Sequence, residues 1–395
     1  MNTDILTRLI QGIDAVLPEA ASLRRMIHSD PHLGGDEGDT RDTIMAASDW
    51  LDWLPVAETG AYARFGPDGA AVGLRAELDA LPITEATGVE WASQRRGIMH
   101  ACGHDVHMAA LWAVIAAARD LDLPVAMVAL LQPREEDNPP GAPDVVASGV
   151  LEDAEVRGMV GVHVQPAVEK GVVSTGAGAV NAAFDSFEIV VHGRGGHGAY
   201  PHVAVDPISV LASIVTALGE LTARTVNPIQ PAVVSVGMIH GGTAPNVFAD
   251  TARCSGTIRA FEEADRAALH EALARVAEGT AMARGATATT TFIRGGRALV
   301  NDARLVARAD RLLTGIGVPV APVPFRSCGS DDFSEYNELV PSLMSFVGTG
   351  TVRGAGLHHA QFLPPSGSLR LSAVALAANY CAAAHLLQTE TGHDA

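Results

Sequence analysis

The stretch that decides the fold is residues 105–132, DVHMAALWAVIAAARDLDLPVAMVALLQ. Its first part, 105–119, has apolar residues at helical spacing and an acidic residue at its start, where a carboxylate suits the helix dipole, so we expect a helix there. Residues 125–132 form an unbroken apolar run typical of a buried parallel strand, as do residues 70–78, AAVGLRAEL. The order strand, helix, strand predicts an α/β fold with a mostly parallel sheet.

A second pattern lies between residues 182 and 294. The expected elements are a strand at 187–193, a helix at 206–224, strands at 232–239 and 252–261, a helix at 262–284 and a strand at 286–293. This β-α-β-β-α-β order is the ferredoxin-like split. We therefore expect an α+β domain, 182–294, inserted into a first domain made of residues 1–181 and 295–395. A helix over 369–387 closes that first domain.

The composition is that of a well-packed enzyme. The chain has 395 residues, 48% hydrophobic and 18% charged, and at roughly 100–200 residues per domain this length suggests two domains. The 27 Lys and Arg against 45 Asp and Glu give a net charge of −18, which argues against nucleic acid as a partner. The N-terminus lacks signal-peptide features, and no run of about 18 uncharged apolar residues predicts a membrane span. We expect a cytoplasmic protein without a membrane partner. The four cysteines show no CxxC spacing, so we expect no disulfide framework.

The segment richest in metal-binding residue types is GIMHACGHDVH, residues 97–107. Cys102 and His104 stand two residues apart, where a loop lets both side chains turn toward one ion. Taken alone, this pair is more typical of a small buried cysteine and a helix-capping histidine. The same eleven residues also contain His100, Asp105 and His107, and this crowding favours a metal site.

Carboxylates follow the ends of two predicted strands. Glu135 and Glu136 come soon after the strand at 125–132, and Asp79 follows the strand at 70–78. Ligand sites in open α/β sheets form at the carboxyl ends of the strands. Adjacent glutamates point differently, so one can bind metal while the other acts as a base; the alternative is a solvated acidic turn. Asp79 can bind a metal or orient a ligating histidine.

Further histidines complete a candidate donor set. His163 lies in an apolar strand-like run, where a core histidine is the alternative, and His358 and His359 lie in a Gly-rich segment, where surface polarity is the alternative. Cysteine, glutamate and three histidines together suit two divalent ions that share a bridging water.

Eight motifs give the chain a family resemblance. In chain order they are LRAELDALP, GIMHACGHDVH, QPREE, GRGGHGAYPH, GGTAPNVFAD, CSGTIRAF, GSDDF and LHHAQF. They resemble the M20 metallopeptidases along nearly the whole chain, most closely the aminoacylase/amidohydrolase branch with its hippurate hydrolases, N-acyl-amino-acid deacylases and auxin-conjugate hydrolases. The resemblance implies a zinc-peptidase-like catalytic domain with two divalent ions per chain, and an inserted lid domain that forms a homodimer.

The resemblance also implies roles for individual residues. Glu135 would be the general base, Asp79 would stand beside the site, and His197 of the lid would stabilise the oxyanion. The implied metal ligands are Cys102, His104, Glu136, His163 and His358, the last chosen because it stands four residues before Phe362 as in the family pattern. The implied substrate contacts are His197, Asn246 and Arg259.

The predicted function is a metal-dependent amidohydrolase that cleaves the amide of N-acyl amino acids or similar small conjugates. A dipeptidase or N-carbamoyl-amino-acid hydrolase of the same family is the alternative. A non-catalytic relative would be expected to lack the base or a ligand, and a cysteine hydrolase using Cys102 with His104 would leave the glutamate pair idle. Thiolate and imidazole favour zinc, while manganese, cobalt and nickel stay open. The family's usual PAEE is PREE at 133–136, followed by an altered loop, DNPPGAP, so no acyl preference is transferred.

Overall fold

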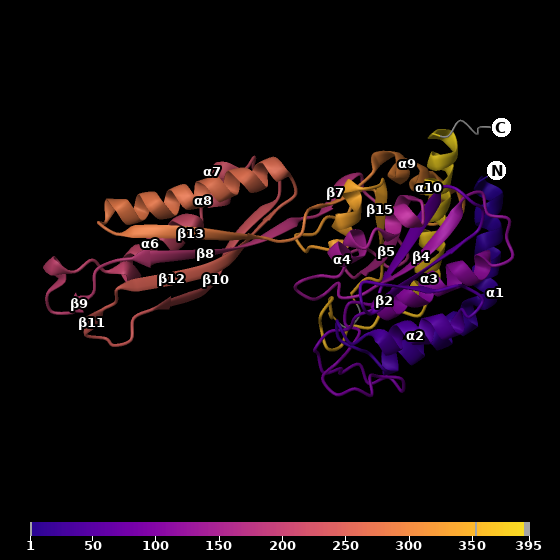
Figure 1. Cartoon of the computed structure of the whole chain (residues 1–395), viewed down its shortest axis with the longest axis horizontal. Coiled ribbons are helices and arrows are strands. Elements are labelled where there is room, and N and C mark those ends of the chain that lie inside the picture. Colours follow the sequence, from indigo (N-terminus) through magenta and orange to yellow (C-terminus); the bar gives the residue numbers. More distant parts are fainter. Residues whose placement is uncertain (1, 352–353, 391–395) are drawn as a thin grey trace. The chain divides into compact units, whose positions relative to one another are not determined.

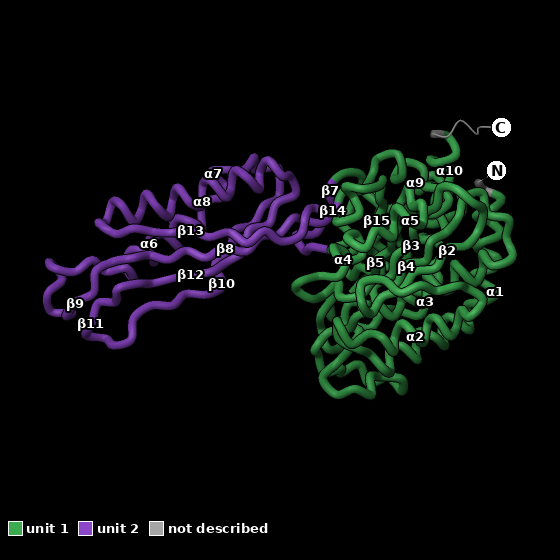
Figure 2. Tube along the Cα trace, in the orientation of Figure 1, with its two compact units in different colours: residues 1–178, 300–325, 332–395 green, residues 179–299, 326–331 purple. Residues whose placement is uncertain are grey.

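The computed structural model describes residues 2–351 and 354–390 and divides the chain into two compact units (Figure 2). Unit 1 consists of residues 1–178, 300–325 and 332–395, and unit 2 of residues 179–299 and 326–331. The inserted domain was expected at 182–294. The second unit thus extends a few residues further at both ends and takes up a short later segment.

Unit 1 is built on a seven-stranded sheet in the order β1-β2-β4-β3-β5-β15-β6. Figure 1 labels β2, β4, β5 and β15 of this sheet. The four central strands, β4, β3, β5 and β15, run parallel, while β1, β2 and β6 pair antiparallel with their neighbours. Every residue of β3 and β4 is buried, which explains their unbroken apolar sequences. The strands are β1 (Leu54–Val56), β2 (Gly60–Phe65), β3 (Ala71–Glu77), β4 (Ala126–Gln132), β5 (Val156–Gln165), β6 (Val173–Ser174) and β15 (Ser342–Gly348).

Helices cover this sheet. α3 (His104–Ala118) and α10 (Gly367–Glu390) pack on the sheet and on each other, and α1 (Asn2–Ser29) packs on both. Among the described residues, α10 is the one helix long and apolar enough to cross a membrane, but 83% of its apolar window is buried within the fold, so it is a core helix. The remaining helices are α2 (Gly38–Ala47), α4 (Ala142–Ala147), α5 (Val150–Asp153), α9 (Ala303–Gly315) and the 3-10 helix η2 (Asp332–Glu338).

Unit 2 has an antiparallel sheet in the order β10-β12-β8-β13, with α6, α7 and α8 packed on it. Chain order and sheet order together give the ferredoxin-like arrangement. Its elements are β8 (Ala183–His192), α6 (Pro207–Leu218), α7 (Leu221–Thr225), β10 (Ala232–Gly241), β12 (Thr251–Ala260), α8 (Glu263–Ala283) and β13 (Thr287–Arg294). The single helix predicted at 206–224 is therefore wrong in one respect: it breaks at Gly219, a poor helix former, into α6 and α7.

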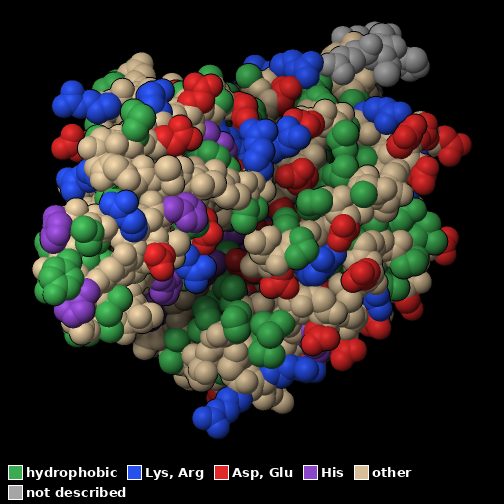
Figure 3. Space-filling model, turned by 60° about the vertical axis from the view of Figure 1, so that its left-hand side comes forward, with side chains coloured by type: hydrophobic (Ala, Val, Ile, Leu, Met, Phe, Trp, Pro, Cys, Tyr) green, Lys and Arg blue, Asp and Glu red, His purple; other side chains and the backbone are tan. Residues whose placement is uncertain are grey.

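Short pairings complete unit 2 and its border. β9 (Gly196–His197) pairs with β11 (Val247–Phe248), β7 (Gly178–Asn181) pairs with β14 (Leu299–Asn301), and η1 spans Pro201–Val203. On the face shown in Figure 3, acidic and basic side chains are interspersed over the surface. The predicted fold class, an α/β domain with an inserted ferredoxin-like α+β domain, is confirmed.

Candidate metal centre

The candidate site lies at the carboxyl ends of neighbouring parallel strands of unit 1. Asp79 follows β3, Glu135 and Glu136 follow β4, and His163 lies near the end of β5. His104 is the first residue of α3, which begins after a loop that returns to the same edge. Because parallel strands end at one edge of the sheet, residues far apart in sequence meet there.

The structure brings the five predicted ligands together. Sγ of Cys102 lies 3.4 Å from Nε2 of His163. Potential donor atoms of Cys102, His104 and Glu136 all lie within 4.8 Å of one another. His358 joins this group because its Nε2 lies 3.0 Å from Oε1 of Glu136.

Hydrogen bonds from Nδ1 set the orientation of the two buried histidines, His104 and His163. His104 Nδ1 donates to the backbone carbonyl of Asp79 at 2.9 Å, and His163 Nδ1 donates to the carbonyl of Val164 at 2.7 Å. Each ring therefore turns Nε2 toward the site. Nε2 of His104 is buried without a hydrogen-bond partner among the described residues. An orphaned buried nitrogen beside a thiol and a carboxylate fits a metal ligand.

His358 lies at the site with an unusual backbone conformation. It has a left-handed φ of +61°, and its N–H donates to the carbonyl of Ala101 at 2.9 Å, next to Cys102. The neighbouring His359 is exposed and uses Nδ1 to accept the N–H of Gln361 at 3.1 Å. Of the two adjacent histidines, His358 is therefore the one at the donor set.

The site carries an excess of negative groups. Burial alone would lower the pKa of His104, but its bond to Asp79 and the charges of Glu77, Asp79 and Glu136 raise that pKa to about 10. Burial, followed by the charges of Glu136 and Glu135, raises the pKa of the Cys102 thiol. A proton on His104 thus offsets buried carboxylates, and a divalent cation would take over that task.

Two buried carboxylates hold the loop of the glutamate pair. Oε1 of Glu37 accepts the N–H of Arg134 at 2.8 Å, and Oδ2 of Asp79 accepts the N–H of Glu136 at 2.8 Å. Between them stands Glu135, whose Oε2 lies 3.8 Å from Nε2 of His104. The sequence did not predict the role of Glu37, because no local motif marks a carboxylate that binds the backbone about 100 residues further along the chain.

A buried histidine and carboxylate lie directly behind the donor set. His107 of α3 and Glu77 of β3 have potential donor atoms within 4.8 Å of those of His104 and His163. The sequence had shown His107 as part of the crowded segment at 97–107. Glu77 was missed, because a single charge in an apolar strand gives no signal of its partner.

Unit 2 contains the predicted lid residues. His197 pairs with Val247 across β9 and β11, and the N–H of Gly198 donates to the carbonyl of Asn246 at 2.8 Å, so His197 and Asn246 lie on adjacent segments. Nδ1 of the exposed His197 accepts the N–H of Ala199 at 3.1 Å, so the ring proton lies on Nε2, which forms no hydrogen bond to any residue the structure describes. These two predicted residues are brought together within unit 2.

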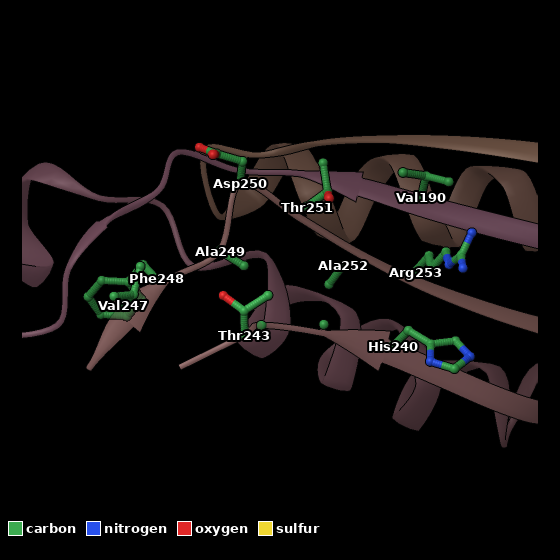
Figure 4. A pocket seen from close by; sticks show the side chains of 12 residues that line it. Val190, His240, Thr243, Val247, Phe248, Ala249, Asp250, Thr251, Ala252 and Arg253 are labelled. Atoms are coloured by element: carbon green, nitrogen blue, oxygen red, sulfur yellow. The ribbon is translucent and has the colours of Figure 1, made fainter. Parts of the chain in front are cut away.

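Arg259 is engaged within the same unit. Its Nη1 donates to the carbonyl of Cys328 at 2.7 Å, and its guanidinium lies 5.3 Å from the ring centre of Phe184. A pocket of ≈440 Å³ lies elsewhere in unit 2, where Figure 4 shows Thr243, His240 and Arg253 among its lining. Arg259 does not line it.

Comparison of the chain with known protein families gives a clear match. The model of peptidase family M20/M25/M40 matches residues 73–379. The chain belongs to this family. The predicted resemblance and the predicted enzyme class, a hydrolase of amide bonds, are thereby confirmed.

Relatives within the family span nearly the whole chain. N-acetylcysteine deacetylase of Bacillus subtilis is 33% identical over 381 residues, covering 94% of this chain and 97% of that protein. Thermostable carboxypeptidase 2 of Saccharolobus solfataricus is 32% identical over 386 residues, again covering 94% and 97%. Among solved structures, the Bacillus subtilis YXEP protein, described as a dinuclear metal binding peptidase of family M20, has a TM-score of 0.83 at 29% identity and covers 94% of this chain and 99% of that one.

Proposed function

We propose that this M20 hydrolase removes the acyl group from N-acyl amino acids with the help of two divalent metal ions. The similarity to an N-acetylcysteine deacetylase and to a carboxypeptidase supports an amide substrate whose amine side is an amino acid. The proposed ligands are Cys102, His104, Glu136, His163 and His358. Thiol and imidazole donors make zinc the first choice of metal, followed by manganese, cobalt or nickel.

The observation that carries the proposal is that the side chains of two adjacent glutamates, Glu135 and Glu136, contact different histidines. Glu136 faces His358 at 3.0 Å, whereas Glu135 stands 3.8 Å from the orphaned nitrogen of His104. This difference supports Glu136 as the metal ligand and Glu135, beside the ligand set, as the base. When bound, the ions polarise the scissile carbonyl and lower the pKa of water.

Glu135 then acts as the proton carrier. Its carboxylate accepts a proton from the attacking water and delivers it to the nitrogen of the leaving amine. Glu37 and Asp79 fix the backbone on either side of it, so the carboxylate keeps its place during the transfer. Asp79 also holds the ring of His104 through its carbonyl.

The lid residues complete the proposal. The free Nε2–H of His197 is suited to donate to the oxyanion of the tetrahedral intermediate, and Asn246, on the adjacent segment, is suited to bind the substrate. Arg259 would contact substrate only through N–H groups other than the one bonded to Cys328. Homodimer formation through unit 2 is supported by exposed apolar side chains on the edge strand β10, namely Met238 and Ile239.

The alternatives are a dipeptidase or a carbamoyl-amino-acid hydrolase, which would use the same water and base. A cysteine hydrolase is disfavoured because the pKa of Cys102 is raised by burial and by nearby carboxylates, the opposite of what a thiolate nucleophile needs. In addition, the contact of hydrogen-bonding length to its sulfur comes from Nε2 of His163, whereas Nε2 of His104 forms no hydrogen bond among the described residues.

The test is amine release from N-acetyl, N-benzoyl and longer N-acyl amino acids, free dipeptides and N-carbamoyl amino acids. Each is measured before chelation, after chelation, and after zinc or manganese is added back. Glu135→Gln should keep its metal and lose roughly 10²–10⁴ in kcat, as expected for a general base. Glu136→Gln should lose metal, and the exposed Glu169→Gln serves as the matched control. Turnover that survives chelation and Glu135→Gln would contradict the mechanism.

A further inference from the structure

His107 connects the helix that carries His104 to the strand that carries His163. The backbone N–H of Val164, the residue after His163, donates to Nε2 of His107 at 2.9 Å. On its other side, Nδ1 of His107 lies 2.9 Å from Oε2 of Glu77. His107 is 1% exposed, and its ring centre lies 4.7 Å from that of His163.

These two bonds fix the tautomer of His107. A backbone N–H can only donate, so Nε2 of His107 must carry the lone pair and Nδ1 the proton. The proton on Nδ1 then points at the carboxylate of Glu77, which can accept it. Reversing the tautomer would set two N–H groups against each other at Val164.

A buried network keeps Glu77 in place. Arg75 Nη1 donates to Oε1 of Glu77. The same guanidinium donates through Nε to Gln132 Oε1 at 2.9 Å and through Nη2 to Asp332 Oδ1 at 2.8 Å. The guanidinium that donates to Glu77 is thus itself held by β4 and η2.

We propose that His107 is a positioning residue that sets the reach of His163 toward the metal. By accepting the Val164 N–H, His107 fixes the peptide unit between His163 and Val164. The carbonyl of the same Val164, on the next peptide unit, accepts His163 Nδ1–H at 2.7 Å, so Nε2 of His163 faces Cys102 at 3.4 Å. This inference rests on the proposed role of His163 as a ligand, and it assigns the aiming of that ligand to a residue that does not touch the metal.

Two substitutions of His107 remove its hydrogen bonds to Glu77 and to Val164 one at a time. In His107→Gln, the amide oxygen takes the place of Nε2 and still accepts the Val164 N–H, but the bond to Glu77 is lost. In His107→Asn, the amide nitrogen takes the place of Nδ1 and still donates to Glu77, but the Val164 N–H is left unpaired. Each variant therefore loses one buried hydrogen bond and keeps the other.

The measurements are zinc affinity by competition with a chromophoric chelator and the thiolate–cobalt absorption band of the cobalt-loaded protein. His107→Asn should lose roughly 10–100-fold in zinc affinity and weaken or shift the band, whereas His107→Gln should stay within a few-fold of wild type. A merely structural role predicts the reverse order, because His107→Gln strips a partner from a buried charge, which is the costlier loss. Equal affinities, or the weaker metal binding in His107→Gln, would overturn the proposal.

A measurement on the wild-type chain covers the case in which the variants do not fold. In metal-free protein labelled with ¹⁵N in its histidine rings, the spectrum should show His107 protonated on Nδ1; protonation on Nε2 would overturn the proposal. Wild-type protein that binds no metal would instead refute the proposed function. Wild type, His107→Asn and His107→Gln all binding zinc equally would refute this inference alone.

Discussion

Gly103 separates the proposed ligands Cys102 and His104, and replacing it with alanine should damage both the stability of unit 1 and its metal site. Its φ is +88°, and a Cβ built on it would lie 2.3 Å from Cγ2 of Val164, the residue after His163. The left-handed backbone costs a non-glycine residue about 1 kcal/mol. The collision with a stiff, buried valine adds about 1–3 kcal/mol. We expect Gly103→Ala to lower the free energy of unfolding by about 2–4 kcal/mol in total.

Gly97→Ala is the matched control, because Gly97 has nearly the same φ, +87°, but no atom of the described chain beyond its two neighbours would lie within 4 Å of the added Cβ. It should lose only the backbone cost of about 1 kcal/mol. The assay is urea unfolding of the metal-free variants followed by tryptophan fluorescence, since all four tryptophans lie in unit 1. Chelator competition then gives zinc affinity, which should fall in Gly103→Ala alone. Equal unfolding midpoints and equal zinc affinities for the two variants would refute the collision argument.

Three further changes have defined outcomes. Burial alone would lower the pKa of His28, but Asp105 and a second carboxylate raise it from 6.5 to about 9. About 3 kcal/mol of stability should therefore be present below pH 6.5 and be lost as the pH rises through 9. Urea unfolding at pH 6 and pH 9.5 should show this loss in wild type but not in His28→Asn. Asp185 is fully buried and accepts from Nε of Arg266 at 2.7 Å, so Asp185→Asn should destabilise unit 2 by about 3 kcal/mol. Hydrogen exchange should rise in 179–299 and stay unchanged in unit 1; a uniform rise would contradict this. Cys102→Ser should weaken zinc binding more than manganese binding, because a hydroxyl lacks the softness of a thiolate, and equal losses in chelator competition would count against Cys102 as a ligand.

The elements of the fold could be predicted because each rests on local pattern. The apolar runs at 70–78 and 125–132 became β3 and β4, buried on both faces as parallel strands are. The order of elements between 182 and 294 gave the ferredoxin-like arrangement of β8, β10, β12 and β13. The break at Gly219 in the helix predicted at 206–224 could not be predicted from the sequence, because the apolar spacing continues across it.

The sequence by itself determined the family and the candidate donors, since motifs such as GIMHACGHDVH keep their residues close together along the chain. Only the tertiary structure decided how those donors are aimed. The bonds between Val164 and His107, between Glu37 and Arg134, and between His107 and Glu77 join residues that are 57, 97 and 30 positions apart, respectively. Such contacts leave no periodic trace in a sequence, because they arise only when parallel strands end at a common edge and bring distant side chains within hydrogen-bonding distance.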